Sequence, residues 1–409
     1  MSTPSEGGPA RTLRDPRLDV FRGAGMFIIL FAHIPWNAWA NWIPARFGFS
    51  DATEIFVFCS GIASALAFAR VFKRRGWALG TARIIQRVWQ VYWAHIGVFV
   101  ATVALLGAAQ AVFPDGRYLA DLNLAPFLAD PVRGLLGLMT LSYVPNYFDI
   151  LPMYLVILAL IPPMMAAAGW DRRLAAAGSL GLWGLAAAGS LDLPAEPWSD
   201  RAWFFNPFSW QLLFFAGFAF GRGWFTPPTF NSKLAVAAGA VLIAAAPFSC
   251  QFGFECHSAW GTAPWLGEAH RALFPLLDKT HLGALRIVHF AALAYLAYSL
   301  AGDGGRRLVG PLSSGLALVG RQTLAVFMTG LVLAQALGVA LDQLGHGWAA
   351  QTFVNAAGCA ILVGVAGLAE WFKGAPWAGK ASSLQRPVSP ALGRALEAPP
   401  GSRPVPGAS

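Results

Sequence analysis

Residues 18–34, LDVFRGAGMFIILFAHI, form the first long apolar segment of the chain and contain two ionisable side chains, Arg22 and His33. Ten residues separate the two. Eleven steps along a helix rotate by about 1100°, within roughly 20° of three full turns, and rise about 16 Å. Arg22 and His33 would therefore share one face. An arginine and a histidine facing lipid would be costly, so we expect this face to turn toward a protein interior or water-filled cavity, where ionisable groups usually mark function.

The composition is that of an integral membrane protein. Of the 409 residues, 56% are hydrophobic and only 12% are charged, which is too few polar side chains to cover a water-soluble globule of this size. A helix needs about 20 mainly apolar residues to cross a bilayer. The sequence predicts an all-α polytopic membrane protein with about ten transmembrane helices, at residues 18–36, 53–70, 84–111, 150–168, 173–189, 206–221, 233–248, 283–301, 314–340 and 350–371.

Charge gives these helices an orientation. The chain has 29 lysines and arginines and a net charge of +9. If the N-terminus is inside, the inner segments hold roughly three times as many basic residues as the outer ones, as expected for short cytoplasmic loops. This bias predicts that both termini are cytoplasmic, and it explains the net charge without a nucleic-acid partner. Long connections, which are usually functional or mobile, then lie on the outer face: 37–52, 112–149, 190–205 and 249–282.

The chain divides into three expected parts. Residues 1–13 form a polar cytoplasmic segment without the apolar core of a signal peptide, so the first span is expected to be a retained anchor. Residues 14–375 form the transmembrane domain. Residues 376–409 are rich in Pro, Gly, Ser and Ala and are expected to be a disordered cytoplasmic tail.

The four cysteines do not form a disulfide scaffold. Cys59 and Cys359 fall inside predicted spans and are expected to be small apolar packing residues. Cys250 and Cys256 share an outer loop, where an oxidising compartment would allow them to pair; free thiols are the alternative. His257 lacks a second pair of ligands at suitable spacing, so we expect no metal site.

His33 is the candidate general base. A histidine with a pKa near 6.5 can accept a proton from a hydroxyl at neutral pH. The alternative is a buried histidine that bonds to a neighbouring helix. Arg22 on the same face favours function, and Asp19, one turn before Arg22, is able to pair with it.

Several stretches resemble the OpgC family, integral membrane succinyltransferases of osmoregulated periplasmic glucans and a branch of the acyltransferase-three superfamily. The superfamily's motif of arginine, ten residues and histidine matches Arg22 and His33. One departure is Gly320-Arg-Gln-Thr323 where a Gly-Arg-Asn-Ser type of sequence is expected. The resemblance covers nearly all of residues 14–375. It rests on RDPRLDVFRG at 14–23, His33-Ile-Pro35, GFSDATEIFVFCSG at 48–61, PNYFDILPMY at 145–154, NPFSWQLLFFAG at 206–217, 282–295 around His289, and GRQTLAVF at 320–327.

This resemblance implies that residues 14–375 are a transmembrane acyltransferase domain in the bacterial inner membrane. It implies succinyl-CoA as co-substrate, with no permanently bound cofactor, and a periplasmic glucan as acceptor; it leaves the oligomeric state open. His33 would be catalytic, with Arg22 as its essential partner. The resemblance also marks Asp149 and Glu370 as important. Asp149 would orient the imidazole or hold the acceptor hydroxyl, or would merely cap the helix that follows. Glu370 would have a direct role or pair with an inner arginine such as Arg22.

The donor and the acceptor would approach from opposite sides. We expect the CoA phosphates at the basic inner face and the thin pantetheine arm along the first helix, so that the thioester reaches His33. For the acceptor pocket, interhelical hydrogen bonds are the alternative explanation of the polar side chains. The predicted CoA-site residues are Arg22, Arg321, Arg74, Arg75, Arg83 and Glu370, and the predicted acceptor-site residues are Asn146, Asn206, Gln211, Arg286 and His289.

Three other functions remain open. The first is an acetyl-type O-acyltransferase acting on another envelope glycan. The second is a proton- or anion-coupled transporter in which Arg22, His33 and Asp149 form a relay, although the sequence has neither the paired broken helices nor the repeats typical of that class. The third is a non-catalytic scaffold for glucan assembly.

Overall fold

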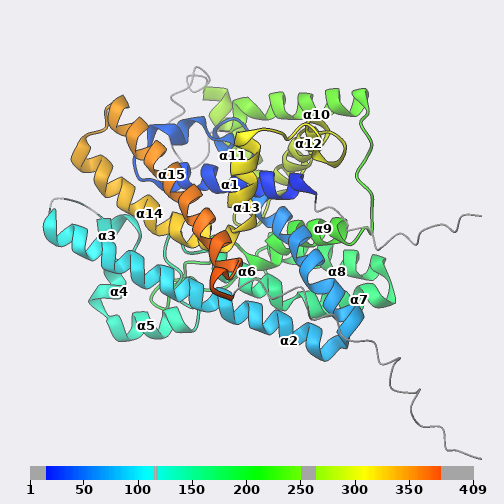
Figure 1. Cartoon of the computed structure of the whole chain (residues 1–409), viewed down its shortest axis with the longest axis horizontal. Coiled ribbons are helices and arrows are strands. Elements are labelled where there is room, and N and C mark those ends of the chain that lie inside the picture. The colour runs from blue at the N-terminus through cyan, green and yellow to red at the C-terminus, as the bar shows by residue number, and fades with distance from the viewer. Residues whose placement is uncertain (1–14, 115, 117, 250–263, 379–409) are drawn as a thin grey trace, which may run out of the picture. The chain divides into compact units, whose positions relative to one another are not determined.

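The computed structural model describes residues 15–114, 116, 118–249 and 264–378, whose regular secondary structure is helical (Figure 1). They contain no strand, only one isolated antiparallel bridge between Pro194 and Ala202. The prediction of an all-α fold is confirmed. The α-helices are α1 (Pro16–His33), α2 (Ala52–Val112), α3 (Tyr118–Asp121), α4 (Ala125–Ala129), α5 (Pro131–Met139), α6 (Ile150–Ala159), α7 (Ile161–Trp170), α8 (Arg172–Ala187), α9 (Pro207–Gly221), α10 (Ser232–Ala245), α11 (Pro264–Leu277), α12 (Ala284–Ala301), α13 (Pro311–Arg321), α14 (Thr323–Leu344) and α15 (Trp348–Lys373).

The shorter 3-10 helices are η1 (Ala38–Trp42), η2 (Pro44–Arg46), η3 (Ala246–Phe248), η4 (Asp303–Gly305) and η5 (Pro376–Ala378). The chain forms one large unit that ends at Glu370 and a small second unit that begins at Trp371. In the second unit the rings of Trp371, Phe372 and Trp377 contact one another. The predicted segment 1–13 and nearly all of the predicted tail lie outside the described residues.

Helix α1 is enclosed by other helices. It begins after Asp15, whose side chain accepts the Arg17 backbone N–H, with Pro16 in the first turn, where a missing N–H costs nothing. Helices α2, α13 and α14 pack against it, and no residue of α1 is exposed. Arg22 and His33 are half-buried among these helices, which is consistent with the prediction that they face protein rather than lipid.

Two glycines allow α1 and α13 to touch backbone to backbone. A Cβ on Gly23 would overlap the carbonyl oxygen of Leu316, and a Cβ on Gly320 would overlap the carbonyl oxygen of Asp19. Small residues are the usual means by which membrane helices approach this closely. The crossing places α13 directly beside the Asp19–Arg22 end of α1.

Helix α2 is two helical arms joined at Gly76. Its 61 residues would extend about 92 Å if straight, roughly three times the thickness of the hydrocarbon core. Gly76 has φ +80°, a conformation that favours glycine, and the arms meet there at an angle (Figure 1). The two predicted spans 53–70 and 84–111 correspond to these arms, and the segment between them is helical apart from this bend.

Five helical stretches are long and apolar enough to cross a membrane, and the protein is a multi-pass membrane protein. The predicted span 150–168 lies within one of these stretches, Ile150–Trp170, although its helix is interrupted at Leu160, just before Pro162 and Pro163, which lack the N–H that a continuous helix needs. One predicted span needs correction. The span 314–340 is divided at Gln322, whose φ of −105° and ψ of 30° leave the helical range. The candidate stretches are Ala52–Val112, Ile150–Trp170, Ala284–Ala301, Thr323–Leu344 and Trp348–Lys373.

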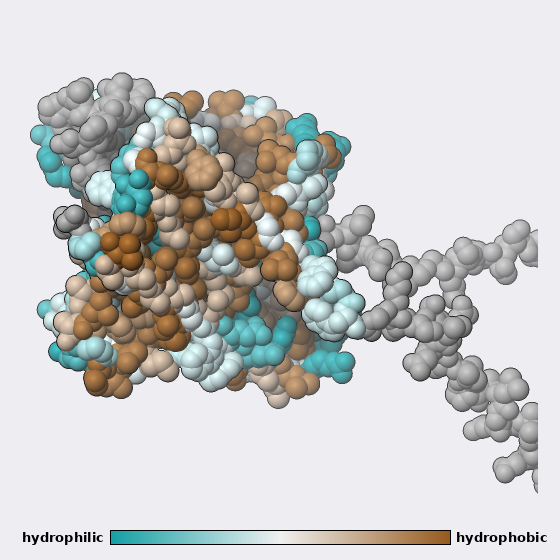
Figure 2. Space-filling view, turned by 60° about the vertical axis from the view of Figure 1, so that its left-hand side comes forward, coloured by the Kyte–Doolittle hydropathy of each residue, from teal (hydrophilic) through white to brown (hydrophobic). Residues whose placement is uncertain are grey.

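Apolar side chains predominate on the face shown in Figure 2, with hydrophilic side chains in smaller groups. Large exposed apolar residues include Leu136, Trp89 and Phe353. A water-soluble monomer rarely exposes so much contiguous apolar surface, whereas lipid covers such a surface in a membrane protein.

The α1–α13 contact yields a stability prediction. Gly23→Ala is expected to lower the midpoint of thermal unfolding in detergent, because overpacking a tight contact costs about 1–3 kcal/mol. Gly25→Ala on the same helix is the control, since its Cβ would lie 3.9 Å from the nearest atom, Cγ2 of Ile55. It should leave the midpoint unchanged or slightly raised. Equal midpoints for the two variants would contradict the backbone contact.

Candidate active site

The imidazole of His33 is held by its own helix. Its Nδ1 lies 2.7 Å from the carbonyl oxygen of Ile29. A carbonyl can only accept, so Nδ1 carries the proton, and in the neutral ring Nε2 is the basic nitrogen. Of the two roles that the resemblance implies for Asp149, orienting the ring or holding the acceptor hydroxyl, the first is filled at Nδ1 by this backbone carbonyl.

Two residues that the sequence analysis missed lie beside His33. The ring of Tyr147 packs edge-on against the imidazole, with ring centroids 4.9 Å apart. Tyr147 has φ +70°, an uncommon conformation for a residue other than glycine and one that concentrates at functional sites. The side chain of Gln335 donates to the backbone oxygen of His33 over 3.4 Å. The sequence signals for them were the motif PNYFDILPMY, which contains Tyr147, and the position of Gln335 as an amide within an apolar helix.

Asp149 is buried two residues after Tyr147, with 4% of its surface exposed. It stands at the N-cap position of α6, but its side chain accepts no capping hydrogen bond. The interpretation of Asp149 as a helix cap is therefore wrong. Its Oδ1 has no partner among the described atoms, which leaves it able to accept a hydrogen bond from a bound hydroxyl. Asn146, in the same loop, is exposed.

Glu370 contacts the end of α13, the helix that packs beside the Asp19–Arg22 end of α1. Its Oε2 accepts a 2.5 Å hydrogen bond from Nε2 of Gln322 and lies 3.5 Å from Nε of Arg321. Glu370 thus pairs with an arginine, Arg321, and also contacts Gln322. Gln322 is the departure from the expected Gly-Arg-Asn-Ser sequence, and its longer amide makes the shorter of the two contacts.

Arg75 and Arg83 come together at the bend of α2. They line a shallow surface pocket of about 420 Å³, in which Arg83 donates to Gln86 over 2.5 Å. Arg74 is exposed but does not line it. None of the lining residues belongs to α1, α13 or α15, so the predicted CoA-site residues form two groups rather than one.

The expected path along α1 between these two ends is closed in this structure. Met26 and Leu30 lie between Arg22 and His33 and are 2% and 1% exposed. Both belong to the main hydrophobic core, because the neighbouring helices pack against this stripe. A thioester arm can pass here only if the helices separate.

Arg286 and His289 hold the start of α2. The guanidinium of Arg286 contacts Oε1 of Glu54 through Nε at 2.8 Å and Nη2 at 2.6 Å. Nδ1 of His289 accepts the Ser50 backbone N–H at 3.3 Å and lies 2.7 Å from its hydroxyl. Lys279 adds a 2.5 Å ion pair with Asp51. The geometry favours the interhelical alternative for Arg286 and His289.

Gln211 and Asn206 also have partners within the protein. Gln211 exchanges hydrogen bonds with the Ser179 hydroxyl at 2.7 Å and its carbonyl at 2.8 Å, which ties α9 to α8. Asn206 caps α9 by accepting from the backbone N–H groups of Phe208 and Ser209. Its own amide donates to Asp192 at 3.0 Å.

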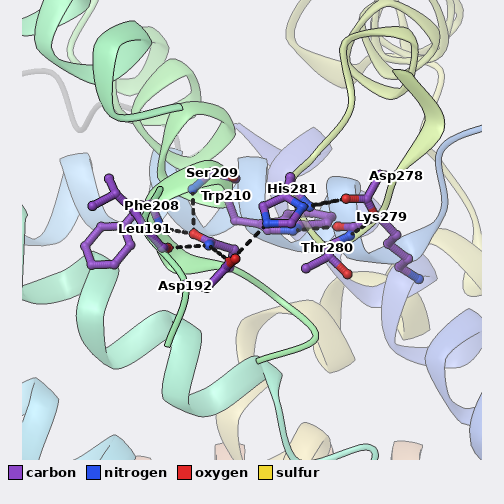
Figure 3. A network of polar contacts seen from close by, with 10 residues as sticks. Leu191, Asp192, Phe208, Ser209, Trp210, Asp278, Lys279, Thr280 and His281 are labelled. Carbon is purple, nitrogen blue, oxygen red and sulfur yellow. Dashed lines mark hydrogen bonds and ion pairs between the residues drawn. The ribbon is translucent and has the colours of Figure 1, made fainter. Parts of the chain in front are cut away.

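Asp192, which accepts from Asn206, also contacts His281, a histidine that lies between two aspartates (Figure 3). Nε2 of His281 lies 3.0 Å from Asp192 and its Nδ1 lies 2.6 Å from Asp278. The loop of His281 is tied to α9 a second time, because Trp210 donates to the carbonyl of Lys279. The sequence analysis missed His281, since its partners are three and 89 residues away.

Comparison with known proteins identifies the family. A family model described as OpgC protein matches residues 14–374. The chain belongs to the OpgC family. Membership supports a general role as an OpgC-type membrane acyltransferase. No curated protein and no solved structure matches the chain.

The remaining predicted sites concern cysteines and metals. Cys59 and Cys359 are free thiols, and Cys59 lies within range of the charges of Arg22 and Asp19. Cys250 and Cys256 lie outside the described residues. Within the described part of the OpgC chain, no group of three or more His, Cys, Asp or Glu side chains is arranged to hold a metal ion.

The contacts of His281 predict a pH-dependent stability. Burial lowers its pKa, but the hydrogen bonds with Asp192 and Asp278 outweigh burial and raise the pKa above its ordinary value. The stabilisation is complete below the unfolded pKa of about 6.5 and is lost as pH rises through the raised folded pKa. The deficit in thermal midpoint of His281→Gln should therefore be largest below the unfolded pKa of about 6.5 and shrink as the pH rises through the raised folded pKa.

The control for this measurement is His346→Gln. His346 is about half exposed and pairs with Asp342 one helical turn away, so its replacement should change the midpoint little at any pH. A deficit in the thermal midpoint of His281→Gln that grows with rising pH would contradict a stabilising role for the contacts of His281 with Asp192 and Asp278.

Proposed function

We propose that this OpgC-family protein transfers a succinyl group from succinyl-CoA to hydroxyls of periplasmic glucans. The observation that carries the proposal is the state of His33: a backbone carbonyl fixes Nδ1, so the basic Nε2 is available for a hydroxyl proton. Asp149, two residues after Tyr147 in the sequence, has a buried Oδ1 without a partner among the described atoms, and in this proposal it orients the acceptor. The matching family supports the acyltransferase class.

The proposed reaction is direct transfer. Nε2 of His33 accepts the proton of the glucan hydroxyl while the hydroxyl oxygen bonds to the thioester carbonyl carbon. The carbon–sulfur bond then breaks, and the CoA thiolate takes the proton from the imidazolium. The products are a glucan ester and free CoA, and His33 returns to its neutral form.

The proposed setting is the bacterial inner membrane, with about ten crossings and both termini cytoplasmic. Acyl-CoA would bind from the cytoplasm and glucan from the periplasm. Because Met26 and Leu30 close the stripe between Arg22 and His33, donor binding would have to separate α1 from its neighbours. The two proposed donor contacts are the Arg75–Arg83 pocket and the Arg321–Gln322–Glu370 group beside Arg22.

The first test removes the base. His33→Ala is expected to lower the rate of glucan-dependent CoA release by about a hundred- to ten-thousand-fold, the usual contribution of a positioned general base. Release is measured with protein reconstituted in vesicles with succinyl-CoA, and the glucan product by its succinyl mass increment. His346→Ala, a change at an exposed histidine, is the control and should keep wild-type activity.

Other results would redirect the assignment. Unchanged turnover in His33→Ala would remove His33 as the base. Glucan uptake into vesicles without ester formation would favour a transporter. An acetyl increment with acetyl-CoA, and none with succinyl-CoA, would replace the proposed donor.

The second test concerns the donor's phosphates. The double variant Arg75→Gln and Arg83→Gln is expected to raise KM for acyl-CoA about three- to tenfold, with kcat little changed. Salt screens the charge of exposed arginines, and their contacts stabilise the bound substrate and the transition state equally. Arg173→Gln, at an exposed arginine outside the pocket, should leave both constants unchanged. A fall in kcat alone would argue against phosphate binding at the bend.

A further inference from the structure

The turn that carries Tyr147 has an aromatic residue where a glycine or asparagine is usual. The backbone N–H of Phe148 donates to the carbonyl of Pro145 over 3.1 Å, so residues 145–148 form a hydrogen-bonded turn. Tyr147 is the third residue of this turn and has φ +70°. A positive φ at the third position favours glycine or asparagine, because other side chains are strained there. The turn therefore carries its tyrosine at a conformational cost.

The ends of this turn are fixed, whereas its tip is exposed. Pro145 and Phe148 are buried, and the ring of Phe148 packs on that of Phe99 with centroids 5.4 Å apart. Tyr147 itself is 47% exposed, so burial of its own side chain does not account for the strained backbone. Residues held in such conformations concentrate at active sites, where the surrounding structure maintains them.

The strained backbone directs the Tyr147 ring onto the imidazole of His33. The two ring centroids are 4.9 Å apart and the ring planes are inclined by 62°, which is the separation and tilt of a favourable edge-to-face contact. With the ends of the turn fixed, a relaxed backbone of negative φ would point the side chain in another direction. The positive φ of Tyr147 and its contact with His33 therefore depend on each other.

The imidazole needs a second contact because one hydrogen bond does not fix the plane of the ring. Nδ1 of His33 bonds to the Ile29 carbonyl at 2.7 Å, but the torsion that turns a histidine ring has a broad energy minimum. Rotation about that torsion displaces Nε2. A general base must lie within hydrogen-bond reach of the proton that it accepts, and a misplacement of about 1 Å can lower a rate about a hundredfold.

We propose that Tyr147 is a positioning residue that holds the imidazole of His33, so that Nε2 is directed at the acceptor hydroxyl. The inference rests on the proposed general-base role of His33. The Ile29 carbonyl fixes one edge of the imidazole and the Tyr147 ring supports it from a second direction. The aromatic ring, rather than the phenolic hydroxyl, provides this support. The conformational cost at Tyr147 thereby serves the orientation of the base.

The test compares two variants of the full-length protein in vesicles. Tyr147→Phe keeps the ring and should keep kcat for glucan-dependent CoA release close to that of wild type. Tyr147→Asn removes the ring but tolerates a positive φ. It should lower kcat about ten- to a hundredfold, with KM for succinyl-CoA nearly unchanged. Its thermal midpoint should equal or exceed that of wild type, because the backbone strain is relieved; a purely structural role would lower the midpoint.

The matched control is Trp36→Asn. Trp36 is another exposed aromatic residue with a positive φ, +57°, so this variant relieves the same kind of strain and should keep wild-type kcat.

A second readout does not need turnover. Diethyl pyrocarbonate acylates the basic nitrogen of a neutral imidazole, and mass spectrometry measures how fast it modifies His33. Tyr147→Asn should change this rate, because the ring loses its support, whereas Tyr147→Phe should modify at the wild-type rate. An unchanged rate in Tyr147→Asn would overturn the inference.

Two further results would also overturn the inference. One is a kcat in Tyr147→Phe as low as in Tyr147→Asn, which would assign the effect to the hydroxyl. The other is a lowered thermal midpoint in Tyr147→Asn with unchanged kcat, which would leave Tyr147 a structural contact only. Wild type that releases no CoA would overturn the proposed function instead, and the modification rate of His33 would still report whether Tyr147 holds the imidazole.

Discussion

The enclosure of α1 is the constraint on which the rest of the structure depends. An apolar helix that carries Asp19, Arg22 and His33 is tolerable in a bilayer only if protein surrounds it. The crossing of Gly23 and Gly320 brings α13 to backbone contact, while α2 and α14 cover other sides. Because α1 has no exposed residue, its ionisable groups meet other side chains rather than lipid.

The two ends of α1 differ in character. At one end, Arg321, Gln322 and Glu370 form a charged, partly exposed group, which suits a charged ligand. At the other end, His33 contacts Tyr147. Asp149, two residues after Tyr147 in the sequence, is buried. Packed core separates the ends, so a reaction that uses both requires the helices to move apart. The two ends of α1 thus lie in different environments.

Many buried polar side chains have an architectural role. Arg286, His289 and Lys279 hold Ser50, Asp51 and Glu54 at the start of α2. The clamp of Asp192, His281 and Asp278 joins two loops through charge-assisted bonds. Such bonds satisfy polar groups that could not be buried alone. This is why residues that seemed suited to an acceptor pocket have partners in the protein.

The sequence by itself determined the membrane class, the all-helical fold, the family and the enclosure of the Arg22–His33 face, because each follows from composition or from periodicity within one segment. It could not determine the partner of Glu370, the break at Gln322, or the roles of Arg286 and His281. Those depend on side chains tens to hundreds of residues apart, which only packing brings within hydrogen-bond distance. The contact between Gln335 and the backbone oxygen of His33 has the same origin: the two residues are 302 positions apart in the chain, and neither α1 nor α14 alone shows that they meet.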